Sequence, residues 1–470
     1  MKCFRLACFL VLLLGTRAAL ADDTTNALDA VFAAKDEKER DKLLRPLQGR
    51  ALADPAAARK HAQDLQLRAP ANLPVLKEAH EGALDYPYEV RTRKTVYKNY
   101  AMLDLPRGIT RDKPVPLVIG LHSEKGTAWF ELSGLRACLA SGAPDLAACI
   151  LACPQALNRG LSTHDPTTNP AGIQEYFGWG PKQEGIDTVF NLLDRLLVDY
   201  NIDRDRIYLC GGGMGGEACF RLALLRPSQF AALGVRDALP PYFLSELKPA
   251  DDKKIEEHRK AGTLGDQAVE FPWLDCYRNT PVTWVHANDD KKYPTAWARR
   301  ASSAMQQAKL PLTWHEYEGF HGSGPKPLIA QGLQEMLAFR RKPGPVTISL
   351  RGLKEGEGEG NSRSYWLELS QQAWPGKKGD WPNKLAAGGS ATVTLDRASN
   401  SVTVKLDGVS EISLWLNDEL LDLDKPISLF VQDKESRQVN AKRELGVLAQ
   451  SAWAMRASGE TYTARITIRP

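Results

Sequence analysis

Between residues 86 and 342, short continuous apolar runs alternate with helical stripes. Continuous runs of this kind are typical of strands that are buried on both faces of a sheet. Their alternation with amphipathic helices predicts a doubly wound, mostly parallel α/β sheet. The apolar runs are 116–121, 149–152, 206–209, 230–233 and 282–285, and the clearest helical stripes lie in 189–200 and 218–225.

The pattern changes after Arg340-Arg-Lys-Pro-Gly-Pro345, a composition typical of a linker. Beyond it the helical period disappears, and β-rich runs follow one another, with a hairpin loop expected at 396–400. This pattern predicts a separate antiparallel β-sandwich domain over residues 345–470. Its expected strands are 346–350, 392–395, 402–406, 412–416 and 427–431.

Two different segments precede the α/β region. Lys2 and Arg5 stand before an apolar run at 6–14, which is too short to span a bilayer, and Ala19-Leu20-Ala21 has the small-x-small pattern of a cleavage site. We therefore expect a signal peptide at residues 1–21 and export to the periplasm or the extracellular space. Residues 22–85 show helical spacings broken by prolines, which predicts a small helical cap packed on the region that follows.

Charge excludes some classes of partner. The chain has 61 Lys and Arg against 57 Asp and Glu, and three of those cations lie in the predicted signal peptide. The remaining chain is nearly neutral overall, so no basic field is expected to recruit nucleic acid or an anionic membrane surface. Apart from the signal peptide, no stretch approaches the length of a membrane span.

Six cysteines follow the predicted signal peptide, at positions 138, 149, 153, 210, 219 and 276. An even number in an oxidising compartment permits disulfides, and the pairing stays open. Cys210 and Cys219 lie in apolar contexts typical of core residues. The sequence has no CxxC or HExxH pattern, so we expect neither a metal site nor a cofactor.

One buried strand runs directly into a glycine-rich turn and then into a helix, over residues 206–224. This arrangement resembles the nucleophile elbow of the α/β-hydrolase superfamily, where the turn is G-x-S-x-G. Here the turn is Gly211-Gly212-Gly213-Met214-Gly215, so Gly213 occupies the position of the serine. The resemblance extends over roughly residues 95–340 and is closest to secreted prolyl-oligopeptidase-like and esterase-like members.

Other parts of that superfamily follow in its usual order of nucleophile, acid and histidine. The resemblance implies that Asp290, after the strand at 282–285, is the acid, and that His321 is the histidine. The loop Leu121-His-Ser-Glu-Lys-Gly126 resembles the HGGG-type oxyanion loop but departs from it at Ser123 and Glu124. By resemblance, the oxyanion hole involves Ser123, Glu124 and Met214.

In a triad the serine attacks a carbonyl, the histidine takes its proton, and the acid holds the histidine. Gly213 has no side chain to activate, and glycine freely adopts the backbone conformation that strains an elbow serine. The resemblance therefore implies a poor or inactive serine hydrolase. Other nucleophiles are unfavourable: Cys210 should point into the core, Cys219 lies a turn into the helix, and the Ser123 loop normally contributes backbone groups.

Three functions remain open from the sequence. The first is an exported hydrolase-fold protein without its nucleophile, weakly active or binding a small ester or peptide ligand. The second is a working ester or peptide hydrolase with an unrecognised nucleophile. The third is glycan or surface binding through the β-sandwich, because Trp366, Trp374 and Trp381 lie close in sequence and exposed tryptophans stack on sugars.

Overall fold

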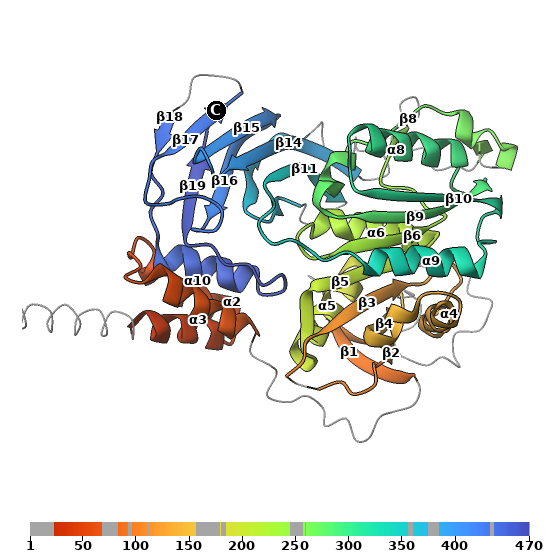
Figure 1. Ribbon diagram of the computed structural model, residues 1–470, viewed down its shortest axis with the longest axis horizontal. Coiled ribbons are helices and arrows are strands. Elements are labelled where there is room, and N and C mark those ends of the chain that lie inside the picture. Colours follow the sequence, from red (N-terminus) through yellow and green to blue (C-terminus); the bar gives the residue numbers. More distant parts are fainter. Residues whose placement is uncertain are drawn as a thin grey trace, which may run out of the picture.

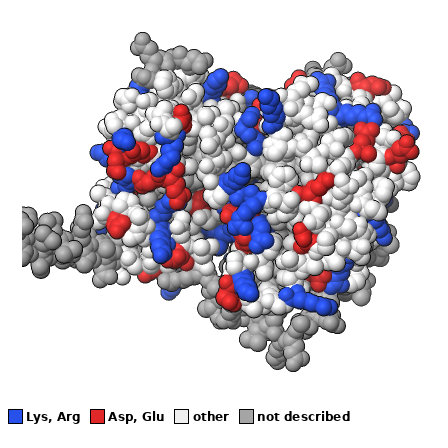
Figure 2. All heavy atoms as spheres, in the orientation of Figure 1, with Lys and Arg blue, Asp and Glu red and all other residues white. Residues whose placement is uncertain are grey.

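The computed structural model describes residues 23–67, 83–92, 96–110, 112–156, 179, 185–244, 257–258, 260–355, 361–374, 385–432 and 437–469. The predicted signal peptide at 1–21 and Trp381 lie outside the described residues. Within the described part of the chain, no helix is both long and apolar enough to cross a bilayer. On the face drawn in Figure 2, positive and negative side chains both lie scattered over the surface.

The α/β region is built on one eight-stranded sheet with the order β1-β2-β4-β3-β5-β6-β9-β10 (Figure 1). β2 runs antiparallel to both of its neighbours, and every other pair in the sheet is parallel. The predicted mostly parallel sheet is therefore confirmed. Its strands are β1 (Leu84–Arg91), β2 (Val96–Asp104), β3 (Val115–Leu121), β4 (Ile150–Pro154), β5 (Ile202–Gly212), β6 (Ala232–Arg236), β9 (Val282–Asp289) and β10 (Leu312–Phe320).

Helices cover both faces of this sheet, which explains why its central strands are apolar throughout. On one face α5 (Gly185–Asp199), α6 (Met214–Leu225) and α8 (Thr295–Gln307) pack into the larger core. On the other face α4 (Ala128–Ala140) and α9 (Lys326–Leu337) pack against the opposite side chains of the same strands. A short ribbon of β7 (Phe243–Leu244) and β8 (Val269–Glu270) lies in the segment before β9.

The C-terminal region contains two packed sheets, β11-β14-β15-β17-β18 and β12-β13-β16-β19, around a core of their own. The predicted antiparallel β-sandwich is therefore confirmed, and one pair of described strands departs from the antiparallel pattern, because β15 and β17 pair in parallel. The strands are β11 (Thr347–Glu355), β12 (Arg363–Ser364), β13 (Leu367–Gln372), β14 (Leu385–Asp396), β15 (Ser401–Asp407), β16 (Val409–Leu416), β17 (Ile427–Val431), β18 (Arg437–Val439) and β19 (Ala464–Ile468).

This region also contains a helix, α10 (Leu445–Ala454), that the sequence pattern did not predict. Val447 packs into the sandwich core, whereas Leu445, Leu448 and Ala449 pack into a second cluster on the opposite side. A helix that is buried on two sides carries no polar stripe, so its sequence lacks the amphipathic period.

The second cluster corrects the predicted position of the N-terminal segment. The helix at 23–33, α2 (Glu37–Leu44), the 3₁₀ turn η1 (Arg45–Leu47) and α3 (Pro55–Leu67) share an apolar core with α10. Figure 1 shows these helices beside α10, below the sandwich. The expectation of a cap on the region that follows is therefore wrong. Helical periodicity showed that an apolar stripe exists, but not which distant surface covers it.

A buried arginine connects the region of the eight-stranded sheet to the C-terminal sandwich. The guanidinium of Arg341 is buried, lies 2.8 Å from Glu460 Oε1 and 2.7 Å from Asp205 Oδ1, and therefore joins the two regions. Nearby, Trp273 Nε1 donates to the carbonyl oxygen of Gly352 at 3.2 Å. The connecting segment is thus held at Arg341, although separate folding of 86–342 and 345–470 stays a prediction.

Two further sequence interpretations can be placed in the fold. The six cysteines from Cys138 to Cys276 are all free and buried, so the described chain contains no disulfide. Trp366 is fully buried and donates from Nε1 to the Pro345 carbonyl oxygen at 2.7 Å. It packs in the sandwich core, so it is not an exposed sugar platform.

Candidate active site

The glycine-rich turn forms a sharp junction between β5 and α6. Gly213, between them, has φ 54° and ψ −119°, a conformation that L side chains adopt only with strain. Its N–H donates to the carbonyl oxygen of Arg236 at 2.9 Å, which fixes the turn to the end of β6. Met214 is the first residue of α6, where a backbone N–H has no acceptor within the helix.

Two glycines of this turn have different surroundings. A β-carbon at Gly215 would overlap the carbonyl oxygen of Leu121, so close backbone approach requires glycine there. A β-carbon at Gly213 would instead lie 3.2 Å from His321 Nε2 and 3.8 Å from the β-carbon of Ser123. A side chain at position 213 would therefore point at the His321 imidazole, which would have to move by a few tenths of an ångström.

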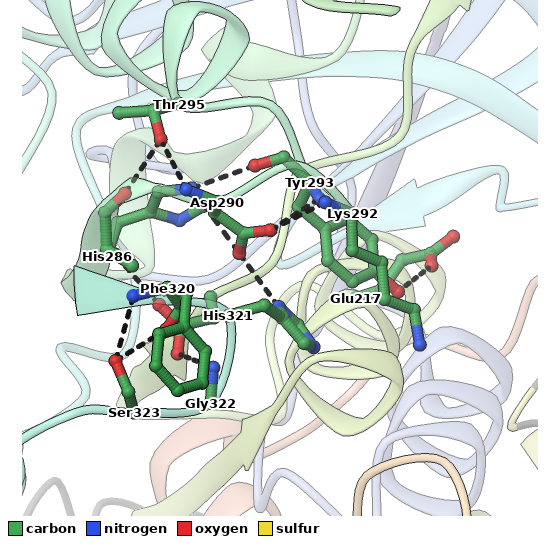
Figure 3. Close-up of polar contacts among 12 residues, drawn as sticks. Glu217, His286, Asp290, Lys292, Tyr293, Thr295, Phe320, His321, Gly322 and Ser323 are labelled. Carbon is green, nitrogen blue, oxygen red and sulfur yellow. Dashed lines mark hydrogen bonds and ion pairs between the residues drawn. The ribbon is translucent and has the colours of Figure 1, made fainter. Parts of the chain in front are cut away.

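The residues predicted as acid and histidine lie together. His321 Nδ1 is 2.8 Å from Asp290 Oδ2 (Figure 3). The Asp290 carboxylate is buried, and its Oδ1 also accepts the backbone N–H groups of Lys292 and Tyr293, both at 2.8 Å. A neutral His321 that donates through Nδ1 directs the lone pair of Nε2 towards the position of the missing side chain.

Asp237, directly after β6, supports this pair and was missed by the sequence analysis. Its Oδ2 accepts from the Tyr317 hydroxyl at 2.8 Å and from the N–H of Gly322 at 3.1 Å, and its Oδ1 accepts from the N–H of Ala287 at 2.9 Å. It is buried and has φ 44°, an uncommon conformation for a residue other than glycine. Asp237 thus ties β9, β10 and the histidine loop together.

His286, on β9, lies behind the acid. Its Nε2 donates to the Tyr293 carbonyl oxygen at 3.0 Å, its ring stacks on Trp314, and burial lowers the pKa of its imidazole. Potential ligand atoms of Asp237, His286 and Asp290 lie within 4.8 Å of one another. Both carboxylates already accept several hydrogen bonds from protein groups, so the cluster is explained as the network that holds the histidine loop.

The ring of Tyr293 packs against the imidazole of His321, and the two ring centroids are 5.5 Å apart. Its hydroxyl donates to Glu217 Oε2 at 3.1 Å, and burial is the largest cause of the raised pKa of this phenol. Glu217 also pairs with Arg221 one turn further along α6. The helix that follows the elbow therefore limits the movement of the histidine, which no local sequence signal indicates.

The loop after β3 is held by His122. This buried imidazole donates from Nδ1 to the Ser123 carbonyl oxygen at 2.9 Å and accepts the N–H of Ala156 at Nε2, at 3.1 Å. Burial lowers the pKa of His122 to about 4, so it is neutral around pH 7. The Nε1–H of Trp179 donates to the His122 carbonyl oxygen at 3.0 Å. These hydrogen bonds therefore hold the loop backbone in place, although its sequence departs from the superfamily pattern.

Ser123 and Glu124, the two residues at which this loop departs from the superfamily pattern, have side chains in different surroundings. Ser123 is half-buried, and its β-carbon lies 3.8 Å from the place of a β-carbon on residue 213, whereas Glu124 is exposed and pairs with Lys292 on the acid turn. The alternative nucleophiles Cys210 and Cys219 lie in the core, where burial raises the pKa of each thiol. Because both thiols are buried in the core, a substrate at the elbow cannot reach them.

Comparison with protein-family models finds no match for the chain, and comparison with the curated proteins finds none either. Among solved structures, a thermostable esterase matches with 20% identity over 55% of this chain and 63% of that chain, at a TM-score of 0.35. A ferulic acid esterase matches with 17% identity over 54% and 96% of the two chains, at a TM-score of 0.38. An S-formylglutathione hydrolase from Agrobacterium tumefaciens matches with 14% identity over 55% and 94%, at 0.35.

The fold assignment depends on the topology of this chain. The sheet is mostly parallel with an antiparallel second strand, and a sharp strand–turn–helix elbow follows its central strand β5. Asp290 and His321, predicted as acid and histidine, follow β9 and β10 in the order of the superfamily pattern. The described chain therefore has an α/β-hydrolase fold, followed by a C-terminal β-sandwich.

Proposed function

We propose that the protein binds a small carboxylic ester or peptide at the elbow and hydrolyses it slowly, because its serine mechanism has been lost at Gly213. One observation carries this proposal. The position that a side chain of residue 213 would fill lies 3.2 Å from His321 Nε2, and His321 Nδ1 is still 2.8 Å from Asp290. The base and its orienting acid are thus in place without the nucleophile that they would activate.

The expected size of the loss follows from the roles of these groups. In a serine hydrolase, removing the nucleophile lowers turnover by a factor on the order of 10⁶, while the oxyanion hole and substrate binding retain roughly 10³–10⁴ over water. The Met214 amide is still available as one oxyanion donor. We expect the second oxyanion donor, on the altered Ser123–Glu124 loop, to be weaker. One misplaced donor lowers turnover by a factor of about 10²–10³.

Gly213→Ser tests the proposal, with Gly213→Ala as its matched control. Both variants add a β-carbon at the same strained position, but only serine adds a hydroxyl near His321 Nε2. We expect turnover of p-nitrophenyl acetate to rise by about 10³–10⁴ in Gly213→Ser, which allows for one misplaced oxyanion donor. Gly213→Ala and the double variant Gly213→Ser/His321→Ala should show no rise.

The same variants give a second measurement. A fluorophosphonate probe should label Gly213→Ser at residue 213 and leave Gly213→Ala unlabelled, because the probe needs a nucleophilic hydroxyl. If Gly213→Ser folds, as judged by its thermal transition, and gains neither turnover nor label, the proposal of a retained acid–base pair is wrong.

We also propose that the protein is exported and that the mature chain begins near Asp22. The proposal is supported by the order of Lys2 and Arg5, a short apolar run and Ala19-Leu20-Ala21. Mass spectrometry of the protein from the exported fraction should find an N-terminus near Asp22. An exported product that keeps residues 1–20 would contradict it.

A further inference from the structure

We propose that Tyr293 is a positioning residue that fixes the His321 imidazole relative to the elbow helix α6. The proposal rests on the proposed function, because it names what holds the general base of that reaction in place. Tyr293 lies three residues after Asp290, in the segment between β9 and α8. Its N–H, its carbonyl oxygen and its hydroxyl each bond to a different residue of the site. The acid, the histidine and the elbow helix therefore meet at this residue.

The acid side of the site fixes the backbone of Tyr293. Its N–H donates to Asp290 Oδ1 at 2.8 Å, and its carbonyl oxygen accepts from His286 Nε2 at 3.0 Å. Both partners are buried, and Asp290 Oδ2 also lies 2.8 Å from His321 Nδ1. The backbone from which the Tyr293 side chain extends is therefore held by the same carboxylate that holds the histidine.

The side chain of Tyr293 extends from the acid turn towards Glu217 on α6 (Figure 3). Its ring packs against the His321 imidazole, with an angle of 38° between the two planes. Its hydroxyl donates to Glu217 Oε2 at 3.1 Å, and Glu217 Oε1 lies 2.5 Å from Arg221 Nη2. The tyrosine ring is thus held at its backbone end by the acid turn and at its hydroxyl end by the elbow helix.

This arrangement supplies a restraint that Asp290 alone does not. The hydrogen bond to Asp290 fixes His321 at one atom, Nδ1, and by itself leaves the ring free to tilt, whereas the packed Tyr293 ring opposes that tilt. Because Glu217 lies on α6, which begins directly after Gly213, the tyrosine also relates the histidine to the elbow. A general base must lie within about 2.6–3.2 Å of the donor of its proton, and a misplacement of about 1 Å can lower the rate about 10²-fold.

The first test measures kcat and KM for p-nitrophenyl acetate in the full-length Gly213→Ser variant. Adding Tyr293→Phe keeps the ring and removes only the hydroxyl, so we expect kcat to fall about 2–10-fold, the effect of one hydrogen bond, with KM unchanged. Tyr293→Leu also removes the ring, and kcat should fall by about 10². Tyr88→Phe is the matched control and should keep kcat, because it removes a buried tyrosine hydroxyl on β1, at the edge of the sheet opposite β10.

Variants of Glu217 separate positioning from simple packing. Glu217→Ala should lower kcat at least as far as Tyr293→Phe, and Glu217→Gln, which keeps an acceptor oxygen, should restore it. The pair Tyr293→Phe and Glu217→Ala together should lose no more than Glu217→Ala alone, because both changes remove the same hydrogen bond. If the two losses add, or if KM rises while kcat is unchanged, Tyr293 does not position His321 through Glu217 and the proposal is wrong.

The second test needs no hydrolysis and uses the full-length native protein. The Nδ1 proton of His321, identified by its loss in His321→Gln, should give a resolved NMR signal because its bond to Asp290 slows exchange with water. The signal should persist in Tyr88→Phe and broaden in Tyr293→Leu. An unchanged signal in Tyr293→Leu, or no protected signal in the native protein, would overturn the proposal. If Gly213→Ser gains no turnover, the proposed function is wrong, whereas this signal still decides the role of Tyr293.

Discussion

The two halves of the candidate site are built differently. The elbow half depends on one residue, Gly213, whose backbone adopts φ 54°. A β-carbon at this position would lie 3.2 Å from Nε2 of His321. The acid–histidine half is held by several bonds: Asp290 accepts two amides besides the His321 ring, and Asp237 accepts three donors.

This difference explains how the elbow can lack a nucleophilic side chain while the hydrogen bonds around Asp290 and His321 remain. The hydrogen bonds to Asp290 and Asp237 all come from other residues, so they form without a side chain at position 213. The glycine also relieves strain at the elbow, on the order of 1–3 kcal/mol. The reactive hydroxyl is therefore the part of such a site that can be removed with least structural cost. Four measurements test whether the two halves are held as differently as these bonds indicate.

The largest effect is expected from Asp237→Ala. It leaves the Tyr317 hydroxyl and the N–H groups of Ala287 and Gly322 without their acceptor, and each buried unsatisfied group costs about 1–3 kcal/mol. We expect the free energy of unfolding in urea to fall by roughly 3–5 kcal/mol. Asp237→Asn keeps one acceptor oxygen and tolerates the positive φ, so it should lose less. Equal losses, or a loss below about 1 kcal/mol for alanine, would show that the histidine loop is held by other contacts.

The second measurement concerns His122 on the elbow side. Burial lowers the pKa of this imidazole from 6.5 to about 4, so between these pH values the unfolded chain binds a proton that the folded protein does not. The contribution of His122 to the free energy of unfolding therefore decreases as the pH falls from 6.5 towards 4, by roughly 3 kcal/mol in total.

The variant His122→Asn isolates this contribution. Its side-chain amide can both donate and accept but does not titrate, so the free energy of unfolding should depend less steeply on pH across that window. Urea unfolding of both proteins at several pH values gives the two slopes. Identical slopes would mean that His122 is protonated in the folded protein well above pH 4.

A third, smaller effect is expected on stability from Gly213→Ser and Gly213→Ala. Both introduce a side chain at a positive φ and a β-carbon 3.2 Å from His321 Nε2, so the imidazole must move by a few tenths of an ångström. We expect each to lower the free energy of unfolding by about 1–3 kcal/mol. A serine variant as stable as the native protein would show that the elbow carries no strain.

The smallest effect is expected from the ion pair that joins the two halves. Lys292 on the acid turn pairs with Glu124 on the loop after β3, and both side chains are partly exposed. A double-mutant cycle with Lys292→Met and Glu124→Gln should give a coupling of about 0.2–1 kcal/mol that weakens in salt. A larger coupling that persists in salt would mean that the two halves depend on each other more than their separate bonding suggests.

Much of this protein follows from local sequence pattern. Continuous apolar runs predict the buried strands because a strand covered on both faces has no polar side, and the Gly211–Gly215 turn identifies the elbow because close backbone approach requires glycine at defined positions. The same pattern places Gly213 where a serine is expected. The resemblance to the superfamily pattern, including the order of its motifs, predicts Asp290 and His321 as acid and histidine.

Only the tertiary structure decided the rest, because those contacts join residues far apart in the chain. Asp237 gains its role from donors on β9, β10 and the histidine loop, and Arg341 is an anchor because Asp205 and Glu460 meet it across the junction. The N-terminal helices pack on α10, nearly the whole chain away, because their shared apolar surfaces fit there. Local periodicity records that a side chain will be buried, whereas its partner is determined by the folding of the entire chain.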